Sequence, residues 1–238
     1  MRIFILTGAG ISAESGLKTF RDNNGLWENH RVEEVATPEA FARDPVLVHR
    51  FYNLRRAALA DVVPNSAHIA LARLQSALRD HGGALTLVTQ NVDDLHERGG
   101  VSDVIHMHGE LARALCSACG FRWDAAGDLM TDTPCPACQT AGGPRPDIVW
   151  FGEMPYHMDR IETELSRADL FVSIGTSGAV YPAAGFVQAA RGHCIETLEL
   201  NMEPSLGSTY FDAARHGPAG TIVPAWVNDV ITQLKTGA

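Results

Sequence analysis

Four of the five cysteines form two Cys-x-x-Cys pairs separated by fifteen residues. Each pair can hold two thiolates on one side of a tight turn, and two pairs complete a tetrahedral zinc site. Two disulfides or four unrelated thiols are the alternatives, but paired spacing without an export signal favours zinc. Four thiolates leave no open coordination position, so we expect a structural zinc that supplies folding energy to a short polar segment. The expected ligands are Cys116, Cys119, Cys135 and Cys138.

A glycine-rich run, Gly8-Ala9-Gly10-Ile11-Ser12-Ala13, follows an apolar segment that predicts the first strand. Glycines at a strand-turn-helix junction let backbone N–H groups approach a pyrophosphate. A dehydrogenase would also need an acidic residue at the end of a second strand, about twenty residues further on. The chain instead continues through Phe20-Arg21-Asp22 without such a strand, which disfavours an ordinary dehydrogenase. Segment 15–30 is rich in Gly and Asn, and we expect a mobile flap there.

A dense polar group, Gln90-Asn91-Val92-Asp93, stands at the end of the second predicted strand. Open parallel sheets bind ligands beyond the carboxyl ends of their strands, so this placement favours a binding role. An Asx-type helix cap would explain one of these side chains but not all of them. His108, after the third predicted strand, is a candidate general base, with a surface or core histidine as the alternative.

Two later strand ends carry small, hydroxyl, amide or acidic side chains, in Gly175-Thr176-Ser177 and Asn201-Met202-Glu203. Such residues suit contact with phosphate or ribose, and Glu203 could accept hydrogen bonds from ribose hydroxyls. A plain turn is the alternative at both places. Cys194 lies alone in the apolar run before the second of them, where we expect a buried thiol.

Outside the cysteine segment, apolar runs alternate with helical patterns, which is typical of a parallel sheet covered on both faces. Thr37-Pro38 and Asp44-Pro45 predict two helix starts. The expected fold is α/β: a Rossmann-like doubly wound parallel sheet, with a small zinc-ribbon and helical domain made of two insertions. We predict strands over 3–7, 84–89, 103–106, 170–174, 195–200 and 221–223, a terminal helix over 225–234, a nucleotide-binding domain of 1–28, 66–110 and 147–238, and a small domain of 29–65 and 111–146.

The 238 residues are 45% hydrophobic and 20% charged, as in ordinary globular proteins. The net charge of −9 disfavours a dedicated nucleic-acid binder. Of the nineteen basic residues only Lys18 and Lys235 are lysines, so a single arginine carries little functional weight by itself. The sequence has no leader-like start, no apolar run of about 18 residues and no tail beyond its predicted elements. We therefore expect a cytoplasmic protein without a membrane anchor.

Taken together, these motifs resemble the sirtuin (Sir2) family of NAD-dependent protein-lysine deacylases, in its bacterial class III type. They follow one another in the family's order from residue 7 to about 225, so the resemblance covers nearly the whole chain. The resemblance implies that NAD is a substrate: the acyl oxygen of an acylated lysine displaces nicotinamide. His108, as the base, then helps a ribose hydroxyl attack the resulting imidate, giving free lysine and 2′-O-acyl-ADP-ribose.

The resemblance also implies roles for individual residues. Asn91 acts with His108 in catalysis, Asn91 and Asp93 position the ribose and the nicotinamide carboxamide, and Arg21 contacts phosphate. The implied NAD-contacting residues are Gly8, Ala9, Gly10, Ile11, Ser12, Glu14, Phe20, Arg21, Trp27, Gln90, Asn91, Val92, Asp93, Gly175, Thr176, Ser177, Asn201, Met202, Glu203 and Ala219.

Two substrate contacts follow from the same resemblance. Tyr52 and Arg55 match the Tyr-x-x-Arg signature of the subgroup that removes succinyl and malonyl groups, and their i, i+3 spacing places both on one helix face. An arginine can bind a carboxylate bidentately, with the tyrosine hydroxyl as a third donor. Segment 147–153, with Val149 and Phe151, resembles the edge to which the substrate peptide adds a strand. A solvated arginine is the alternative for Arg55 and our expectation for Arg50 and Arg56, and the helix should bury Leu47, Phe51, Leu54 and Ala58.

Two alternatives to a desuccinylase and deacetylase stay open. Within enzymology, the chain could mainly transfer ADP-ribose to proteins or hydrolyse NAD. In another class, it could be a catalytically silent NAD-sensing module, against which the intact Gln90, Asn91, Asp93 and His108 argue. The expected partners are acylated-lysine proteins, without direct binding to nucleic acid or membrane.

Overall fold

The computed structural model describes residues 1–17, 26–27 and 30–236. Most of the flap expected over 15–30, with Phe20, Arg21 and the side chain of Trp27, lies outside the described residues. In the described part, no helix combines the length and the apolar character that a membrane span needs.

Six parallel strands form the central sheet, in the order β11-β10-β9-β1-β4-β5. Numbered along the chain, this is the order 3-2-1-4-5-6 of a doubly wound nucleotide-binding sheet. The order reverses between β1 and β9, where a crevice opens beyond the carboxyl ends of the strands. The strands are β1 (Arg2–Thr7), β4 (Ala84–Thr89), β5 (Ile105–His106), β9 (Leu170–Ile174), β10 (Glu196–Asn201) and β11 (Ala213–His216).

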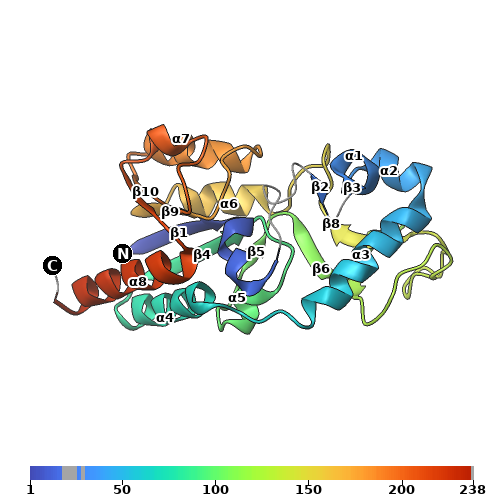
Figure 1. Ribbon diagram of the computed structural model, residues 1–238, viewed down its shortest axis with the longest axis horizontal. Coiled ribbons are helices and arrows are strands. Elements are labelled where there is room, and N and C mark those ends of the chain that lie inside the picture. Colours follow the sequence, from blue (N-terminus) through green and yellow to red (C-terminus); the bar gives the residue numbers. More distant parts are fainter. Residues whose placement is uncertain (18–25, 28–29, 237–238) are drawn as a thin grey trace.

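Alternate side chains of the sheet enter two separate cores. Ile3 and Ile5 pack in the core beneath α4 (Ser66–Asp80) and α8 (Ala219–Thr236). Phe4 and Leu6 face the opposite way, into the core beneath α6 (Met158–Leu165) and α7 (Phe186–Gly192). The two helix pairs therefore lie on opposite sides of the sheet (Figure 1).

The two insertions meet in a second body beside the sheet (Figure 1). Helix α3 contacts both β6 and β8 of a three-stranded antiparallel sheet with the order β7-β6-β8. Their shared core contains Phe51 and Tyr52 from α3, Leu111 from β6 and Ile148 from β8, with Trp150 just beyond. The remaining elements are α1 (Val32–Val35), α2 (Pro38–Arg43), α3 (Pro45–Leu59), α5 (Leu95–Arg98), β2 (Leu26–Trp27), β3 (His30–Arg31), β6 (Gly109–Cys116), β7 (Arg122–Asp124) and β8 (Pro144–Ile148), with short 3-10 turns between them.

Both predicted helix starts are confirmed. The side chain of Thr37 accepts a hydrogen bond from the backbone N–H of Ala40 at 3.0 Å, and Asp44 accepts one from Leu47 at 2.9 Å. In each helix the following proline occupies the first turn, where no N–H is needed.

Three local predictions are wrong. The segment 221–223 is the start of α8, and the sixth strand is Ala213–His216 instead. Cys194 is exposed, because it lies in a turn with a φ of +59° before β10 begins at Glu196. The glycine-rich run was expected to lead into a regular helix, but two short 3-10 turns follow Gly8 instead.

The buried face of α3 also differs from the expected stripe. Leu54 is 62% exposed, whereas Val48, Tyr52 and Leu59 are buried. Arg56, expected to be a solvated arginine, is half-buried and donates to the carbonyl of Leu111 at 2.9 Å. The helix is therefore turned so that its polar side chains fasten the cysteine-bearing segment to it.

Candidate active site

A cavity of about 1090 Å³ lies between the carboxyl ends of the sheet and the second body. It collects the described candidates for catalysis, NAD binding and substrate binding from both bodies, except that Ile11 lies in the core beneath the glycine-rich turn. The candidates that line it are Gly8, Ala9, Gly10, Ser12, Glu14, Tyr52, Arg55, Gln90, Asn91, Val92, Asp93, His108, Val149, Phe151, Gly175, Thr176, Ser177, Asn201, Met202, Glu203 and Ala219.

The floor of the cavity is formed by the turns that follow the neighbouring strands β1 and β9, which pack closely on each other. The N–H of Gly8 donates to the carbonyl of Ile174 at 3.0 Å, and the N–H of Gly10 donates to that of Gly175 at 2.9 Å. A Cβ on Gly10 would stand 2.8 Å from Gly175 Cα, and Gly175 itself has a φ of +63°. These glycines therefore bring β1 and β9 together, and their two N–H groups already have backbone acceptors.

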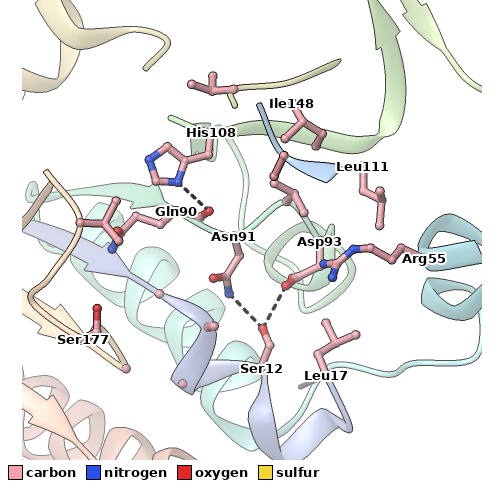
Figure 2. A pocket seen from close by; sticks show the side chains of 18 of the residues that line it. Ser12, Leu17, Arg55, Gln90, Asn91, Asp93, His108, Leu111, Ile148 and Ser177 are labelled. Atoms are coloured by element: carbon pink, nitrogen blue, oxygen red, sulfur yellow. Dashed lines mark hydrogen bonds between the residues drawn. The ribbon is translucent and has the colours of Figure 1, made fainter. Parts of the chain in front are cut away.

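Ser12 joins the polar residues after β4 into one network (Figure 2). Its hydroxyl donates to Asp93 Oδ2 at 3.2 Å and accepts from Asn91 Nδ2 at 3.1 Å. Asp93 Oδ1 also accepts from the N–H of Leu95 at 3.2 Å, which makes an Asx turn just before α5; the N-cap of that helix is Asp94, whose side chain makes no capping hydrogen bond. Burial raises the pKa of Asp93, while these two hydrogen bonds oppose the shift. The network fixes the Asn91 carboxamide at the edge of the cavity.

Two buried histidines, whose ring centres are 4.9 Å apart, lie next to this network. His68 Nδ1 accepts from the N–H of Asn65 at 3.3 Å, so in its neutral form Nε2 carries the proton, 3.4 Å from Ser12 Oγ. His96 Nε2 lies 3.0 Å from the hydroxyl of Thr7. Burial lowers the pKa of His68 to about 4 and that of His96 well below its usual value, so both rings are neutral at pH 7. Neither histidine was predicted as a functional residue, because nothing in its type or spacing separates it from a core histidine.

His108 lies in the short connection between β5 and β6, with its side chain toward the cavity (Figure 2). Its Nδ1 lies 3.1 Å from the carbonyl of Gln90, which can only accept, so Nδ1 carries the proton. Burial lowers the pKa of His108, against the opposing effect of that carbonyl. The ring is therefore neutral at pH 7, with Nε2 as an acceptor, which is the state a general base needs.

The following glycine sets the position of His108. Gly109 has a φ of +82°, and a Cβ there would stand 2.0 Å from the carbonyl oxygen of Asp147. Because only glycine allows this approach, the start of β6 can pair closely with the end of β8, and the N–H of Val149 donates to the carbonyl of His108 at 2.9 Å. The candidate base and the candidate peptide edge are thus one hydrogen-bonded unit.

The far end of the cavity holds Tyr52 and Arg55 from α3. Tyr52 is fully buried and accepts a hydrogen bond from Trp150 Nε1 at 3.0 Å. Burial raises the pKa of Tyr52, so it stays a neutral phenol. The guanidinium carbon of Arg55 lies 5.5 Å from the centre of the Phe51 ring. Figure 2 shows Arg55 reaching from α3 toward the side where Asn91 and Asp93 lie.

Several cavity residues escaped the sequence reading. Ile148, Trp150 and Glu153 belong to the predicted peptide edge 147–153, but no individual role was predicted for them. The others are mostly apolar, and nothing in their type or spacing separates them from core residues. They include Leu17, His30, Leu111, Val180 and Tyr181.

The four paired cysteines gather in one cluster, with all four sulfurs within 4.8 Å of one another. Sγ of Cys116 lies 3.8 Å from that of Cys138, and Sγ of Cys119 lies 3.7 Å from that of Cys135. A tetrahedral site with Zn–S of about 2.3 Å requires sulfurs about 3.8 Å apart, so the cluster fits zinc. The site's composition leaves no open position, which suits a structural metal.

The two halves of the cluster have the same backbone geometry. Gly120 N–H donates to the carbonyl of Cys116 at 2.8 Å, and Gln139 N–H donates to that of Cys135 at 2.9 Å. Gly120 and Gln139 both have positive φ, at +74° and +60°. Each Cys-x-x-Cys pair is thus a tight turn with both sulfurs on one side, as its spacing predicts.

Comparison with known proteins agrees with this geometry. The model of the Sir2 family matches residues 8–182. Over 234 residues the chain is 58% identical to the "NAD-dependent protein deacylase" of Caulobacter vibrioides, covering 98% of each. It is 54% identical over 239 residues to the protein of the same name from Escherichia coli (strain K12), covering 100% of this chain and 85% of that one. A solved complex of a Sir2 homologue with NAD has a TM-score of 0.87 and 38% identity, covering 98% and 90% of the two chains. The chain therefore belongs to the Sir2 family.

Proposed function

We propose that this protein is an NAD-dependent protein-lysine deacylase. The observation that carries the proposal is one cavity that holds a neutral, correctly oriented His108 beside Asn91 and the Ser12–Asp93 network. The names of its relatives support the same activity and the use of NAD. Acylated proteins are then its substrates.

In such a reaction, different residues of this site bind the nucleotide, orient it and accept a proton. Bound NAD supplies an activated ribose carbon and a nicotinamide leaving group. The glycines after β1 and β9 have no side chains, which leaves room for the nucleotide at the switch point of the sheet, and Glu203 borders the same cavity. Asn91 and Asp93 hold the ribose and carboxamide, because Ser12 orients both. Nε2 of His108 accepts a proton from a ribose hydroxyl.

The proposal is tested by the product. Purified protein is incubated with NAD and acetyl-, malonyl- or succinyl-lysine peptides, and the nucleotide products are identified by mass spectrometry. We expect 2′-O-acyl-ADP-ribose and free nicotinamide in equal amounts with at least one peptide. ADP-ribosylated protein or free ADP-ribose as the main product would favour the transferase or hydrolase alternative. NAD that is bound but unchanged with every peptide would favour the silent module.

We further propose that acidic acyl groups are preferred substrates. Tyr52 contributes a buried phenol at the far end of the cavity, and Arg55 contributes a cation beside it. A dicarboxylic acyl group ends in a carboxylate that both donors can bind, whereas an acetyl group ends in a methyl. In a chain with a net charge of −9, this local cation selects an anionic substrate.

Replacing Arg55 by methionine tests this preference. We expect kcat/KM for succinyl peptides to fall roughly 30- to 100-fold, because a charged hydrogen-bonded pair is lost. Deacetylation should change less than about threefold, since methionine keeps most of the apolar stem. Arg79→Met, an exposed arginine on α4, is the control for removing one charge. Equal losses on acetyl and succinyl peptides would contradict the preference.

We also infer that the chain has two functional units, because the three-stranded sheet and α3 share a core that is separate from the cores of the six-stranded sheet. The nucleotide-binding unit is 1–28, 66–110 and 147–238, and the small unit is 29–65 and 111–146. Their proposed boundaries at 110/111 and 146/147 fall within β6 and β8, so these two strands are the connections between the units. We propose a cytoplasmic location, which cell fractionation with an epitope-tagged chain can test.

A further inference from the structure

We propose that Trp150 is a positioning residue for acyl selectivity, which acts by orienting the hydroxyl of Tyr52. The inference rests on the proposed function and extends it to a side chain of segment 147–153 to which neither the Tyr-x-x-Arg spacing nor the peptide edge assigned a role. Trp150 is 2% exposed, follows β8 and borders the cavity. Its Nε1 lies 3.0 Å from the Tyr52 hydroxyl.

The direction of this hydrogen bond follows from chemistry. An indole N–H can only donate, so the oxygen of Tyr52 is the acceptor. The tyrosine's own O–H must then point to a different acceptor. Because burial raises the pKa of Tyr52, that proton stays on the oxygen at neutral pH. Trp150 thereby restricts the directions in which Tyr52 can donate, and a carboxylate is a strong acceptor for such a donor.

The indole is held in place from two sides. The guanidinium of Arg145 lies over it, 3.9 Å from the ring centre. Arg145 also pairs with both carboxylate oxygens of Glu153 at 2.8 Å, and its side chain is only 9% exposed. Glu153 in turn accepts from the backbone N–H of Trp150 at 2.9 Å. The Arg145–Glu153 ion pair therefore contacts both the indole ring and the backbone of Trp150. These contacts restrict the direction of the indole N–H.

This arrangement has no evident use for an acetyl group, which offers a methyl at this end of the cavity. For an acetyl group, a phenylalanine at position 150 would fill much of the same space, and the indole N–H would not be needed. The N–H is useful when the acyl group carries an acceptor that Tyr52 must meet at a fixed angle. Selectivity between acidic and neutral acyl groups is therefore the property that Trp150 should control.

The test compares Trp150→Phe, Tyr52→Phe and the double variant. For Trp150→Phe we expect kcat/KM with succinyl peptides to fall roughly fivefold, mainly through KM, because one hydrogen bond that orients a ligand donor is lost. Deacetylation should stay within about twofold. In the Tyr52→Phe background, the tryptophan change should not alter the succinyl/acetyl ratio further, because its partner hydroxyl is already gone. Trp123→Phe, on β7, is the matched control.

Equal losses on both acyl groups, or effects of Trp150→Phe and Tyr52→Phe on the ratio that simply multiply, would overturn the inference. If Trp150→Phe unfolds, benzothienylalanine at position 150 keeps the ring shape and replaces only the N–H. Calorimetric binding of succinyl and acetyl peptides without turnover separates this inference from the proposed function. If the wild-type chain never deacylates but Trp150→Phe weakens the binding of succinyl peptide and not of acetyl peptide, the inference about Trp150 holds and the proposed function is rejected. A wild-type chain that neither turns over nor binds succinyl peptide would reject both.

Discussion

His108→Ala is expected to lower kcat/KM for every acyl peptide by roughly 10²- to 10⁴-fold, the usual contribution of a positioned general base. The ring has one defined role in the structure: Nδ1 is held by the carbonyl of Gln90, so Nε2 faces the cavity as the acceptor. The loss should fall on kcat for acetyl and succinyl peptides alike, because His108 lies apart from the acyl-binding end.

The pH dependence gives this prediction a second readout. Burial holds the pKa of His108 below 6.5, and the base is active only when neutral. Activity should therefore persist from pH 8 down to about 6.5 and fall as the pH drops through the lowered pKa. The acid limb of kcat/KM should be absent from the residual activity of His108→Ala.

A partial reaction identifies the step at which His108 acts. The release of nicotinamide precedes the proton transfer in the proposed reaction. Exchange of labelled nicotinamide into NAD, with acyl peptide present, should therefore survive in His108→Ala while product formation stops. His193→Gln, an exposed histidine after α7, controls for the loss of an imidazole. Loss of exchange together with deacylation, in a variant with an unchanged melting temperature, would place His108 in binding instead.

Loss of the zinc cluster should have the largest effect on stability. Cys119→Ser is expected to reduce bound zinc from one per chain to nearly none and to lower the melting temperature by at least roughly 10 °C. Structural zinc contributes on the order of 10 kcal/mol in small modules, and in a chain of this size about 1 kcal/mol corresponds to roughly 2–4 °C. The three remaining sulfurs cannot complete a closed tetrahedral site.

Activity should fall together with zinc, although no cysteine lines the cavity. Cys116 ends β6, and β6 pairs with β8, whose continuation carries Val149 and Trp150. Loosening the cluster therefore disturbs the frame that holds the peptide edge against His108. Metal content by mass spectrometry and thermal unfolding are the measurements. Cys194→Ser, an exposed cysteine outside the cluster, is the control, and a Cys119→Ser chain that matched it in zinc and stability would refute a structural zinc site.

Local sequence signals predicted much of this structure correctly because short-range physics produces them. A proline after Thr37 or Asp44 together with a capping oxygen begins a helix whatever the chain does elsewhere. Strands over 84–89 and 170–174 are mainly apolar runs with only Thr or Ser between the apolar residues, as expected of a sheet covered on both faces. The two cysteine turns repeat one local geometry, so their spacing alone indicated a metal site.

Where the sequence misled, long-range packing decided. The β-branched residues at 221–223 predict a strand, but Val223 and the turns after it pack as a helix against α4 and the sheet. The true edge strand, Ala213–His216, is entirely exposed and has no apolar pattern. It is a strand because its backbone pairs with β10, and its own side chains do not predict this pairing.

The sequence by itself determined which residue types are available for chemistry: the glycines after β1, the polar group after β4, His108 and the four cysteines. Only the tertiary structure decided how they act together. Ser12 joins Asn91 to Asp93 across 79 and 81 residues of chain, and Trp150 meets Tyr52 across 98. Such contacts depend on how strand ends and insertions are brought together, and a hydrogen bond between distant residues leaves no periodic trace in the sequence. The protonation states of His108 and Tyr52 likewise arise from burial, which exists only in the folded chain.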